Sequence, residues 1–182
     1  MNICVYCGSA AGNEDCYADT ARELGTWIAE SGHTLVYGGG GVGLMGAVSD
    51  AALAAGGHVI GVMPTFLIER EGSRSSSIEK YETPDMAQRK AKMIELSDVF
   101  IALPGGAGTM EEITEVLSLR KLGLVDAPCA VYNVEGFYDS LVALYDEQLA
   151  CGFATPEIRA QLEVVDSLEG VERLVEGAES GA

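Results

Sequence analysis

Six short runs of apolar residues, separated by segments with helical spacing, constrain the fold of this 182-residue chain more than any other feature. Each run is apolar along nearly its whole length, as in "NICVYC" near the N-terminus, instead of alternating between apolar and polar residues. Continuous apolar strands are typical of a parallel sheet with both faces covered, and regular alternation with helices is typical of α/β proteins. The pattern therefore predicts an α/β fold, a Rossmann-like, doubly wound parallel sheet flanked by helices on both faces.

The expected elements alternate along the whole chain. We expect strands at residues 2–7, 34–38, 58–63, 98–103, 129–134 and 162–166, and helices at 14–31, 43–55, 85–96, 109–122, 136–150 and from 167 onward. Residues 64–83 contain the turn-forming stretch "EGSRSSS" and are expected to form a long loop. We interpret residues 1–176 as one nucleotide-binding domain and residues 177–182 as a frayed tail.

Charge and composition exclude several classes of protein. A net charge of −17 argues against a general nucleic-acid or anionic-membrane surface, because both need clustered Lys and Arg. No apolar run approaches the roughly 20 residues of a membrane span. The five cysteines are irregularly spaced and no secretory signal is apparent, so we expect free thiols in the cytoplasm. "CVYC" is expected in the core, and two histidines are few for a zinc site or a Ser-His-Asp triad, so no metal is expected.

Three loops rich in glycine or small residues follow expected strands: "CGSA" (7–10), "GGGGVGLMG" (38–46) and "PGGAGT" (104–109). Glycine lets a ligand approach the backbone N–H groups closely, and a following helix adds its positive N-terminal end. Because strand ends of a parallel sheet share one edge, the loops predict a phosphate or nucleotide cleft. For "GGGGVGLMG", close packing of strand on helix is an alternative interpretation.

Two familiar nucleotide motifs are excluded by their context. G-x-G-x-x-G occurs in two registers, beginning at Gly38 and at Gly41, but it follows the second strand, and the next strand ends "GVMPT" without the acid that an NAD site needs. A Walker A loop needs a Gly-Lys pair, and the chain has none.

Two groups of charged residues allow both a structural and a chemical interpretation. Thr109 to Glu112 spells T-x-x-E, which is also a helix-capping box whose acids would suit the helix dipole. In "MAQRKAKM" (86–93), Arg89 and Lys90 share a helical face and form a local positive spot in an acidic chain. Salt bridges on a solvated helix face are the alternative for this second group.

Together these motifs resemble one family. "PGGAGTMEE", with "QRKAKM" upstream, "CGSA" near the start and "GGGGVGLMG" after the second strand, is similar to the LONELY GUY (LOG) family. The likeness extends from about residue 2 to residue 175. Members are cytokinin riboside 5′-monophosphate phosphoribohydrolases, and many were formerly called "possible lysine decarboxylase". Ala87 departs from the histidine that usually stands in the family's M-H-x-R-K.

The resemblance implies hydrolysis of the N-glycosidic bond of an AMP that is modified on its exocyclic amine, by a homodimeric enzyme without a cofactor. It implies Arg89 and Glu112 as the catalytic pair. Candidate substrate-binding residues are Ser9, Gly39, Glu71, Lys90, Gly105, Gly106, Ala107, Gly108, Thr109, Glu111 and Ser118. A non-catalytic nucleotide-binding module and a broader AMP nucleosidase are the alternatives. Lysine decarboxylation is disfavoured, since no motif for a Schiff-base lysine is apparent.

Overall fold

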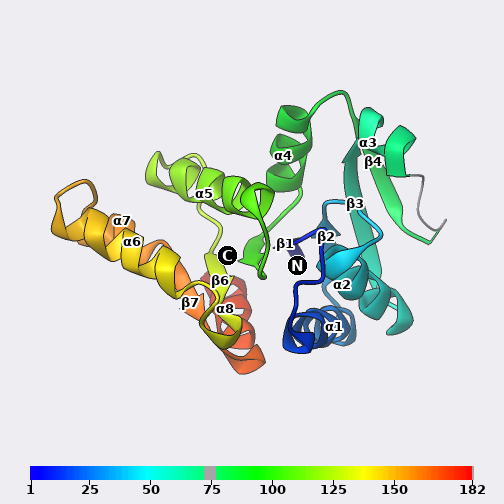
Figure 1. The fold of residues 1–182 in the computed structure, drawn as a ribbon, viewed down its shortest axis with the longest axis horizontal. Helices are drawn as coiled ribbons and strands as arrows, with labels where there is room; N and C mark the ends of the chain where they lie inside the picture. Colours follow the sequence, from blue (N-terminus) through cyan, green and yellow to red (C-terminus); the bar gives the residue numbers. More distant parts are fainter. Residues whose placement is uncertain (72–76, 182) are drawn as a thin grey trace.

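A computed structural model describes residues 1–71 and 77–181, with only the backbone of Glu71. Within these residues seven strands form one parallel sheet, in the order β4-β3-β2-β1-β5-β6-β7 (Figure 1). The strands are β1 Asn2–Tyr6, β2 Thr34–Tyr37, β3 His58–Pro64, β4 Glu79–Thr83, β5 Val99–Ala102, β6 Cys129–Tyr132 and β7 Glu163–Val165. The predicted doubly wound parallel sheet is confirmed.

The order of the strands creates a switch point in the middle of the sheet. From β1 the chain builds outward through β2, β3 and β4, and it then returns to place β5, β6 and β7 on the other side of β1. In sheets of this kind ligands bind beyond the carboxyl ends of the strands at the switch point, here between β1 and β5. The helices are α1 Asp15–Glu30, α2 Gly43–Ala54, α3 Thr65–Glu71, α4 Met86–Glu95, α5 Ala107–Lys121, α6 Asp139–Ala150, α7 Pro156–Ala160 and α8 Leu168–Gly181, with a 3₁₀ turn, η1, at Val134–Gly136.

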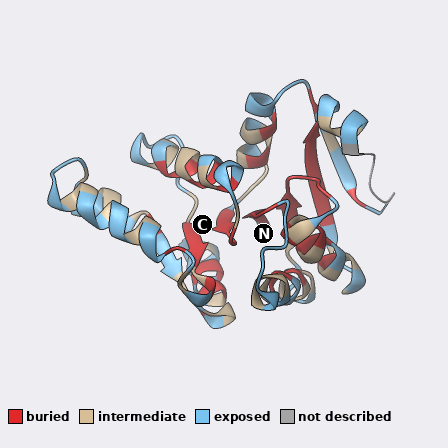
Figure 2. Cartoon of the chain, in the orientation of Figure 1, coloured by how far each residue is buried: buried red, intermediate tan, exposed pale blue. Residues whose placement is uncertain are grey.

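Two apolar layers cover the two faces of the sheet. Successive residues of a strand face opposite sides, so Cys4 and Tyr6 of β1 enter one layer while Val5 and Cys7 enter the other. Helices α1, α2 and α8 cover one face, and α4, α5 and α6 lie on the other (Figure 1). Buried residues concentrate on the strands and on the inward faces of these helices (Figure 2). The two cysteines of "CVYC" are therefore core residues on opposite faces, as expected.

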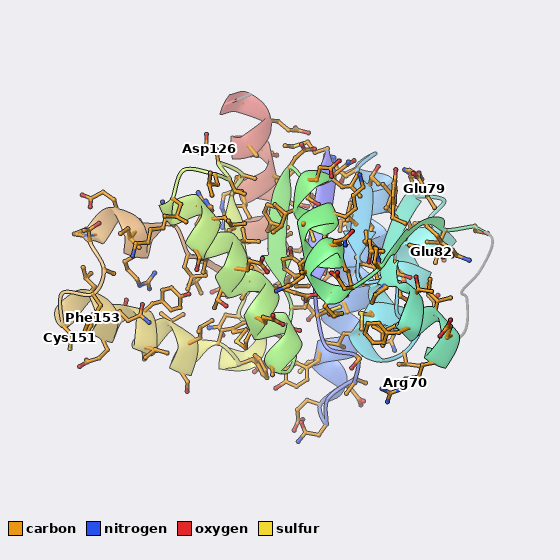
Figure 3. All side chains as sticks on the ribbon, turned by 90° about the horizontal axis from the view of Figure 1, so that it is seen from above. Arg70, Glu79, Glu82, Asp126, Cys151 and Phe153 are labelled. Carbon is orange, nitrogen blue, oxygen red and sulfur yellow. The ribbon has the colours of Figure 1, made fainter. Side chains whose placement is uncertain are left out.

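The prediction of a long loop at residues 64–83 was wrong. The described part of this segment contains α3 and β4, and β4 pairs with β3 as the outermost strand. Four of the five residues of β4 are exposed or half-buried, so its sequence "EKYET" lacks the continuous apolar run of a central strand. Glu79 and Glu82 of this strand lie at one side of the molecule in Figure 3.

Further details of the helices differ from the expectation. Helix α5 begins at residue 107 rather than 109, and the short helix α7 was not expected. Residues 177–181 of the expected tail belong to the last part of α8, beyond its last buried residue, Val175.

Helices α6 and α7 form an arm that projects from the sheet (Figure 1). Helix α6 has no buried residue, and Cys151 and Phe153 lie at the tip of the arm (Figure 3). Phe153 is 79% exposed. All five cysteines are free thiols, and no helix among the described residues has the length and apolar character needed to span a bilayer.

Candidate active site

The three glycine-containing loops meet at the switch point. The Gly8 N–H donates to the Pro104 carbonyl at 3.0 Å, which joins the loop after β1 to the loop after β5. The Gly8 carbonyl accepts from the N–H groups of Leu44 and Met45 at 3.1 and 3.3 Å, which joins the same loop to the start of α2. The expectation that the loops share one edge of the sheet is confirmed.

The second half of "GGGGVGLMG" packs against its neighbours. A Cβ on Gly43 would lie 2.4 Å from the backbone of Ser9, and φ there is +61°. A Cβ on Gly46 would lie 2.7 Å from the Gly41 carbonyl oxygen. Since Gly8 already accepts from the N–H groups at the start of α2, this half of the motif serves close packing. Gly38 and Gly40, in the first half, line a cavity instead.

This cavity, of about 330 Å³, lies at the carboxyl edge of the sheet. Its walls come from β1 and the loop after it, from the loop after β2, and from α2, β3, α3, α4 and α5. The lining residues are Val5, Tyr6, Cys7, Gly8, Ser9, Gly38, Gly40, Met45, Met63, Leu67, Arg89, Gly106, Ala107, Gly108, Thr109 and Glu112. Arg89 and Glu112 are its two charged side chains within the described part of the chain.

One end of the cavity is the N-terminus of α5. Gly106 is the N-cap and has no side chain to satisfy the first N–H groups of the helix. The N–H groups of Ala107, Gly108 and Thr109 form the first turn, where a helix offers them no internal acceptor. The positive end of the helix dipole adds to these donors, so this end of the cavity suits an anion.

Glu112 enters the same cavity from the second turn of α5. Its side chain is 9% exposed, and its Oε1 accepts a hydrogen bond from Arg89 Nη1 at 2.7 Å. Thr109 is the third residue of the helix and not its N-cap, so Thr109 and Glu112 do not form the alternative capping box. The carboxylate therefore faces the cavity and Arg89 instead of closing the helix end.

The guanidinium of Arg89 is held on three sides. Besides the ion pair with Glu112, its Nε donates to the Val62 carbonyl at 3.1 Å and its Nη2 donates to the Gly38 carbonyl at 3.4 Å. Val62 lies near the carboxyl end of β3, and Gly38 directly follows β2. The arginine, 8% exposed, is thus fixed between the strand ends and the carboxylate, and the alternative of a solvated helix face is wrong for this residue.

Burial shifts the pKa values of two groups that line the cavity, Glu112 and Cys7. Desolvation raises the pKa of Glu112 above its ordinary value, and the attraction and hydrogen bond of Arg89 only partly offset that rise. A carboxylate with a raised pKa is a stronger base, which suits a group that must take a proton near neutral pH. Burial also raises the pKa of the Cys7 thiol, so this cavity residue stays a neutral thiol and is a poor nucleophile.

Comparisons with known proteins match this arrangement. The sequence profile of a family described as "Possible lysine decarboxylase" matches residues 45–175. The cytokinin riboside 5′-monophosphate phosphoribohydrolase LOG1 of Arabidopsis thaliana is 49% identical over 157 residues, which cover 86% of this chain and 74% of that protein. LOG3 of the same plant is 43% identical over 180 residues, which cover 99% of this chain and 82% of that protein. The chain belongs to the LONELY GUY (LOG) family.

Solved structures of other proteins share the fold. The molybdenum cofactor carrier protein of Chlamydomonas reinhardtii superposes with a TM-score of 0.75 at 22% identity, with 98% of each chain covered. The molybdenum cofactor binding protein of Rippkaea orientalis gives 0.72 at 23% identity, covering 97% of this chain and 95% of that one. At such identities the likeness extends to the fold alone.

Seven of the thirteen residues expected from the LOG motifs line the cavity: Ser9, Arg89, Gly106, Ala107, Gly108, Thr109 and Glu112. Gly39 and Gly105 lie in its loops but outside the lining. A Cβ on Gly105 would lie 2.2 Å from Thr109 Oγ1, so glycine here leaves room for the Thr109 side chain. The side chain of Glu71 lies outside the described residues.

Three other LOG-motif residues also lie outside the lining. Lys90 Nζ is held by Glu111 at 2.8 Å and by Glu115 at 2.7 Å, so it joins α4 to α5. Ser118 donates to the Thr114 carbonyl on the outer side of α5. It is six residues beyond Glu112, about 9 Å along the helix and on another face.

The apolar part of the cavity was not predicted. Met45, Met63 and Leu67 line it from α2, β3 and α3. Met63 could have been found, because it ends an expected strand at the same edge as the glycine loops. Leu67 could not, because it lies in the segment that was expected to be a loop.

Proposed function

We propose that this chain hydrolyses the N-glycosidic bond of a nucleoside 5′-monophosphate, an AMP that carries a substituent on its exocyclic amine. Water and the nucleotide give the free base and ribose 5-phosphate. The observation that carries the proposal is the position of the buried Glu112 carboxylate in the same cavity as the open N-terminus of α5. The names of the LOG relatives support the same reaction.

The phosphate would occupy the N-terminus of α5. Its oxygens can accept from the first-turn N–H groups of Ala107, Gly108 and Thr109, and its charge is favoured by the helix dipole. Ser9, from the loop after β1, also lines the cavity and can add a hydroxyl donor. Binding energy from the phosphate then positions the sugar for reaction.

Glu112 would act on the sugar. Cleavage develops positive charge on the ribose ring, and a carboxylate beside the anomeric carbon stabilises that charge. Glu112 can also accept a proton from the attacking water, whose oxygen bonds to the anomeric carbon while the bond to the base breaks. The base leaves with the bonding electron pair and takes up a proton, so the atoms balance.

Arg89 would orient Glu112 rather than grip the phosphate. Its Nε and both terminal nitrogens already have partners, in two strand-end carbonyls and the carboxylate. Lys90 would support this arrangement from α4 through Glu111, outside the cavity. We retain Gly39, Glu71, Gly105 and Ser118 as candidate substrate-binding or loop-supporting positions implied by the LOG motifs.

The base would extend toward the apolar wall. Met45, Met63 and Leu67 line the cavity from α2, β3 and α3, and their side chains suit an aromatic ring with an apolar substituent. The N–H groups of an unmodified exocyclic amine would gain little there, which favours substituted AMP over AMP.

The proposal is tested with purified protein and three compounds: AMP, N6-isopentenyl-AMP and the matching riboside, with products separated by chromatography. We expect base release from isopentenyl-AMP, less from AMP and least from the riboside. Binding of AMP without release of base from any monophosphate would favour the non-catalytic module. Equal cleavage of the riboside and its monophosphate would contradict the phosphate site on α5.

We further propose that the chain acts as a homodimer in the cytoplasm. Ile113, Val116 and Leu117 of α5 are buried in the core, so a dimer surface would use exposed residues just past this helix. Leu122 and Leu124 are 68% and 70% exposed there. Light scattering of the wild type should give twice the chain mass, and Leu124→Asp should reduce the measured mass toward that of one chain. A monomeric wild type at micromolar concentration would refute the dimer.

A further inference from the structure

The guanidinium of Arg89 lies directly against the backbone at the end of β2. A Cβ built on Gly38 would lie 2.0 Å from Arg89 Nη2 and 3.2 Å from Arg89 Cζ. Real Cβ atoms do not approach other atoms so closely, so any side chain at this position must displace the arginine. The hydrogen bond from Nη2 to the Gly38 carbonyl holds the guanidinium in this place.

The backbone itself does not require glycine at residue 38. The φ angle of Gly38 lies outside the left-handed region, whereas Gly39 next to it has φ of +79°. The φ angle of Gly38 is therefore one that alanine also adopts. The remaining reason for glycine is the space that Arg89 and, at 3.2 Å, the Met45 sulfur occupy.

We propose that Gly38 is a positioning residue: its missing side chain leaves the space in which Arg89 reaches Glu112. The inference rests on the proposed function, because it assigns Gly38 a role in orienting the carboxylate that acts on the sugar. Gly38 does not act on the substrate itself. It acts through Arg89, which spans from the end of β2 to the second turn of α5.

The atom that a Cβ on Gly38 would overlap, Arg89 Nη2, lies at the end of a long side chain that can move. Alanine at residue 38 would move the guanidinium and leave the strand in place, because the side chain of Arg89 can rotate and the backbone cannot. The ion pair with Glu112, now 2.7 Å long, would lengthen or break. A displacement of about 1 Å in catalytic groups can cost on the order of 100-fold in rate.

A change in the pKa of Glu112 would reveal the displacement of the Arg89 guanidinium. Arg89 lowers the pKa of Glu112 against the larger effect of burial, so withdrawal of the guanidinium raises it further. The other titratable groups that interact with the carboxylate are Lys90 of α4, Glu111 of α5, Cys4 and Tyr6 of β1, and Cys7 just after β1. None of these contacts Gly38 in the way that Arg89 does, so their effect should stay constant in the variant.

The first test compares Gly38→Ala with Gly40→Ala, after thermal melts establish that both fold. A Cβ on Gly40 would meet Met45 Cε at 2.9 Å, the free end of a flexible side chain. We expect kcat for isopentenyl-AMP to fall on the order of 100-fold in Gly38→Ala. In Gly40→Ala the displaced side chain is Met45 of the proposed base-binding wall, so the loss should appear mainly in KM and kcat should fall much less than in Gly38→Ala. Equal losses in the two folded variants would overturn the inference.

A double-mutant cycle separates a role through Arg89 from a general packing effect. In an Arg89→Met background, adding Gly38→Ala should lower kcat by less than about a further twofold, because the effects of contacting residues that act together are not additive. Independent, multiplying losses would show that Gly38 acts without Arg89.

A third measurement decides the inference without relying on activity. Titration of the ¹³C-labelled Glu112 carboxyl by NMR should give a higher pKa in Gly38→Ala than in wild type, and an unchanged pKa in Gly40→Ala. An unshifted Glu112 in folded Gly38→Ala would overturn the inference. A wild type that releases no base, together with the predicted NMR shift, would defeat the proposed function while sustaining the role of Gly38.

Discussion

Removal of the buried arginine should destabilise the protein in a manner that depends on pH. In Arg89→Met the aliphatic part of the side chain is retained, but Glu112, 9% exposed, loses its cation. Breaking a buried ion pair from one side costs about 3–5 kcal/mol, because the remaining charge is left without compensation. We expect a loss of this size in the free energy of unfolding at pH 8.

The sign of the pH dependence follows from the pKa of Glu112. Burial already raises this pKa, and without Arg89 nothing of comparable strength opposes the rise. A carboxyl with a raised pKa in the folded state contributes stability below its unfolded pKa, and this contribution is lost as the pH rises through the folded pKa. Each pH unit in that window changes the free energy of unfolding by about 1.4 kcal/mol, so the cost of Arg89→Met should be smaller at pH 5 than at pH 8.

The assay is urea unfolding at pH 5 and pH 8, with Arg120→Met as the matched control. Arg120 donates to the Gln161 carbonyl at 2.7 Å, and the structure records no carboxylate partner for it among the described residues. Both substitutions change the net charge equally. Destabilisation by Arg89→Met that is the same at both pH values, as expected for Arg120→Met, would refute the reasoning.

Three further predictions concern activity and stability. The acid limb of kcat should lie above the ordinary glutamate pKa of 4.5, because desolvation raises the pKa of Glu112; a pH–rate profile that is flat down to pH 4.5 would contradict this. Gly105→Ala should raise KM for the monophosphate roughly tenfold or more, because its Cβ would lie 2.2 Å from Thr109 Oγ1 and distort the anion loop; an unchanged KM speaks against that loop as the phosphate site. Asp85→Ala should lower the free energy of unfolding by about 1 kcal/mol, because Asp85 caps α4 by accepting from the Gln88 N–H at 2.8 Å; thermal melts check this, and an unchanged melting temperature would deny the cap.

The central part of the fold could be predicted from the sequence, and its edge could not. Strands β1, β2, β3, β5 and β6 are buried on both faces, which forces the continuous apolar runs that identified them. Strand β4 is an exposed edge strand, so no such constraint acts on "EKYET" and no run marks it. Strand β7 is also exposed, but it was expected because its sequence contains the short apolar pair "VV".

The candidate site shows a similar division. Motif spacing located Arg89 and Glu112, which the fold brings together from α4 and α5 at 2.7 Å. The sequence could not decide between a capping box and a free carboxylate, because that depends on whether the helix begins at residue 107 or 109. Lys90 shows the limit of such reasoning: it follows Arg89 directly, yet a turn of about 100° per residue directs it to Glu111 and Glu115, outside the cavity.

The most direct test of the proposed chemistry is the turnover of Glu112→Gln with saturating N6-isopentenyl-AMP. Glutamine retains the size of the side chain and an oxygen that can accept from Arg89, but it can neither take a proton from water nor carry the charge that stabilises the ribose cation. We expect kcat to fall on the order of 1,000-fold while KM stays nearly constant. A variant that retains kcat within tenfold of wild type would show that this carboxylate does not perform the reaction.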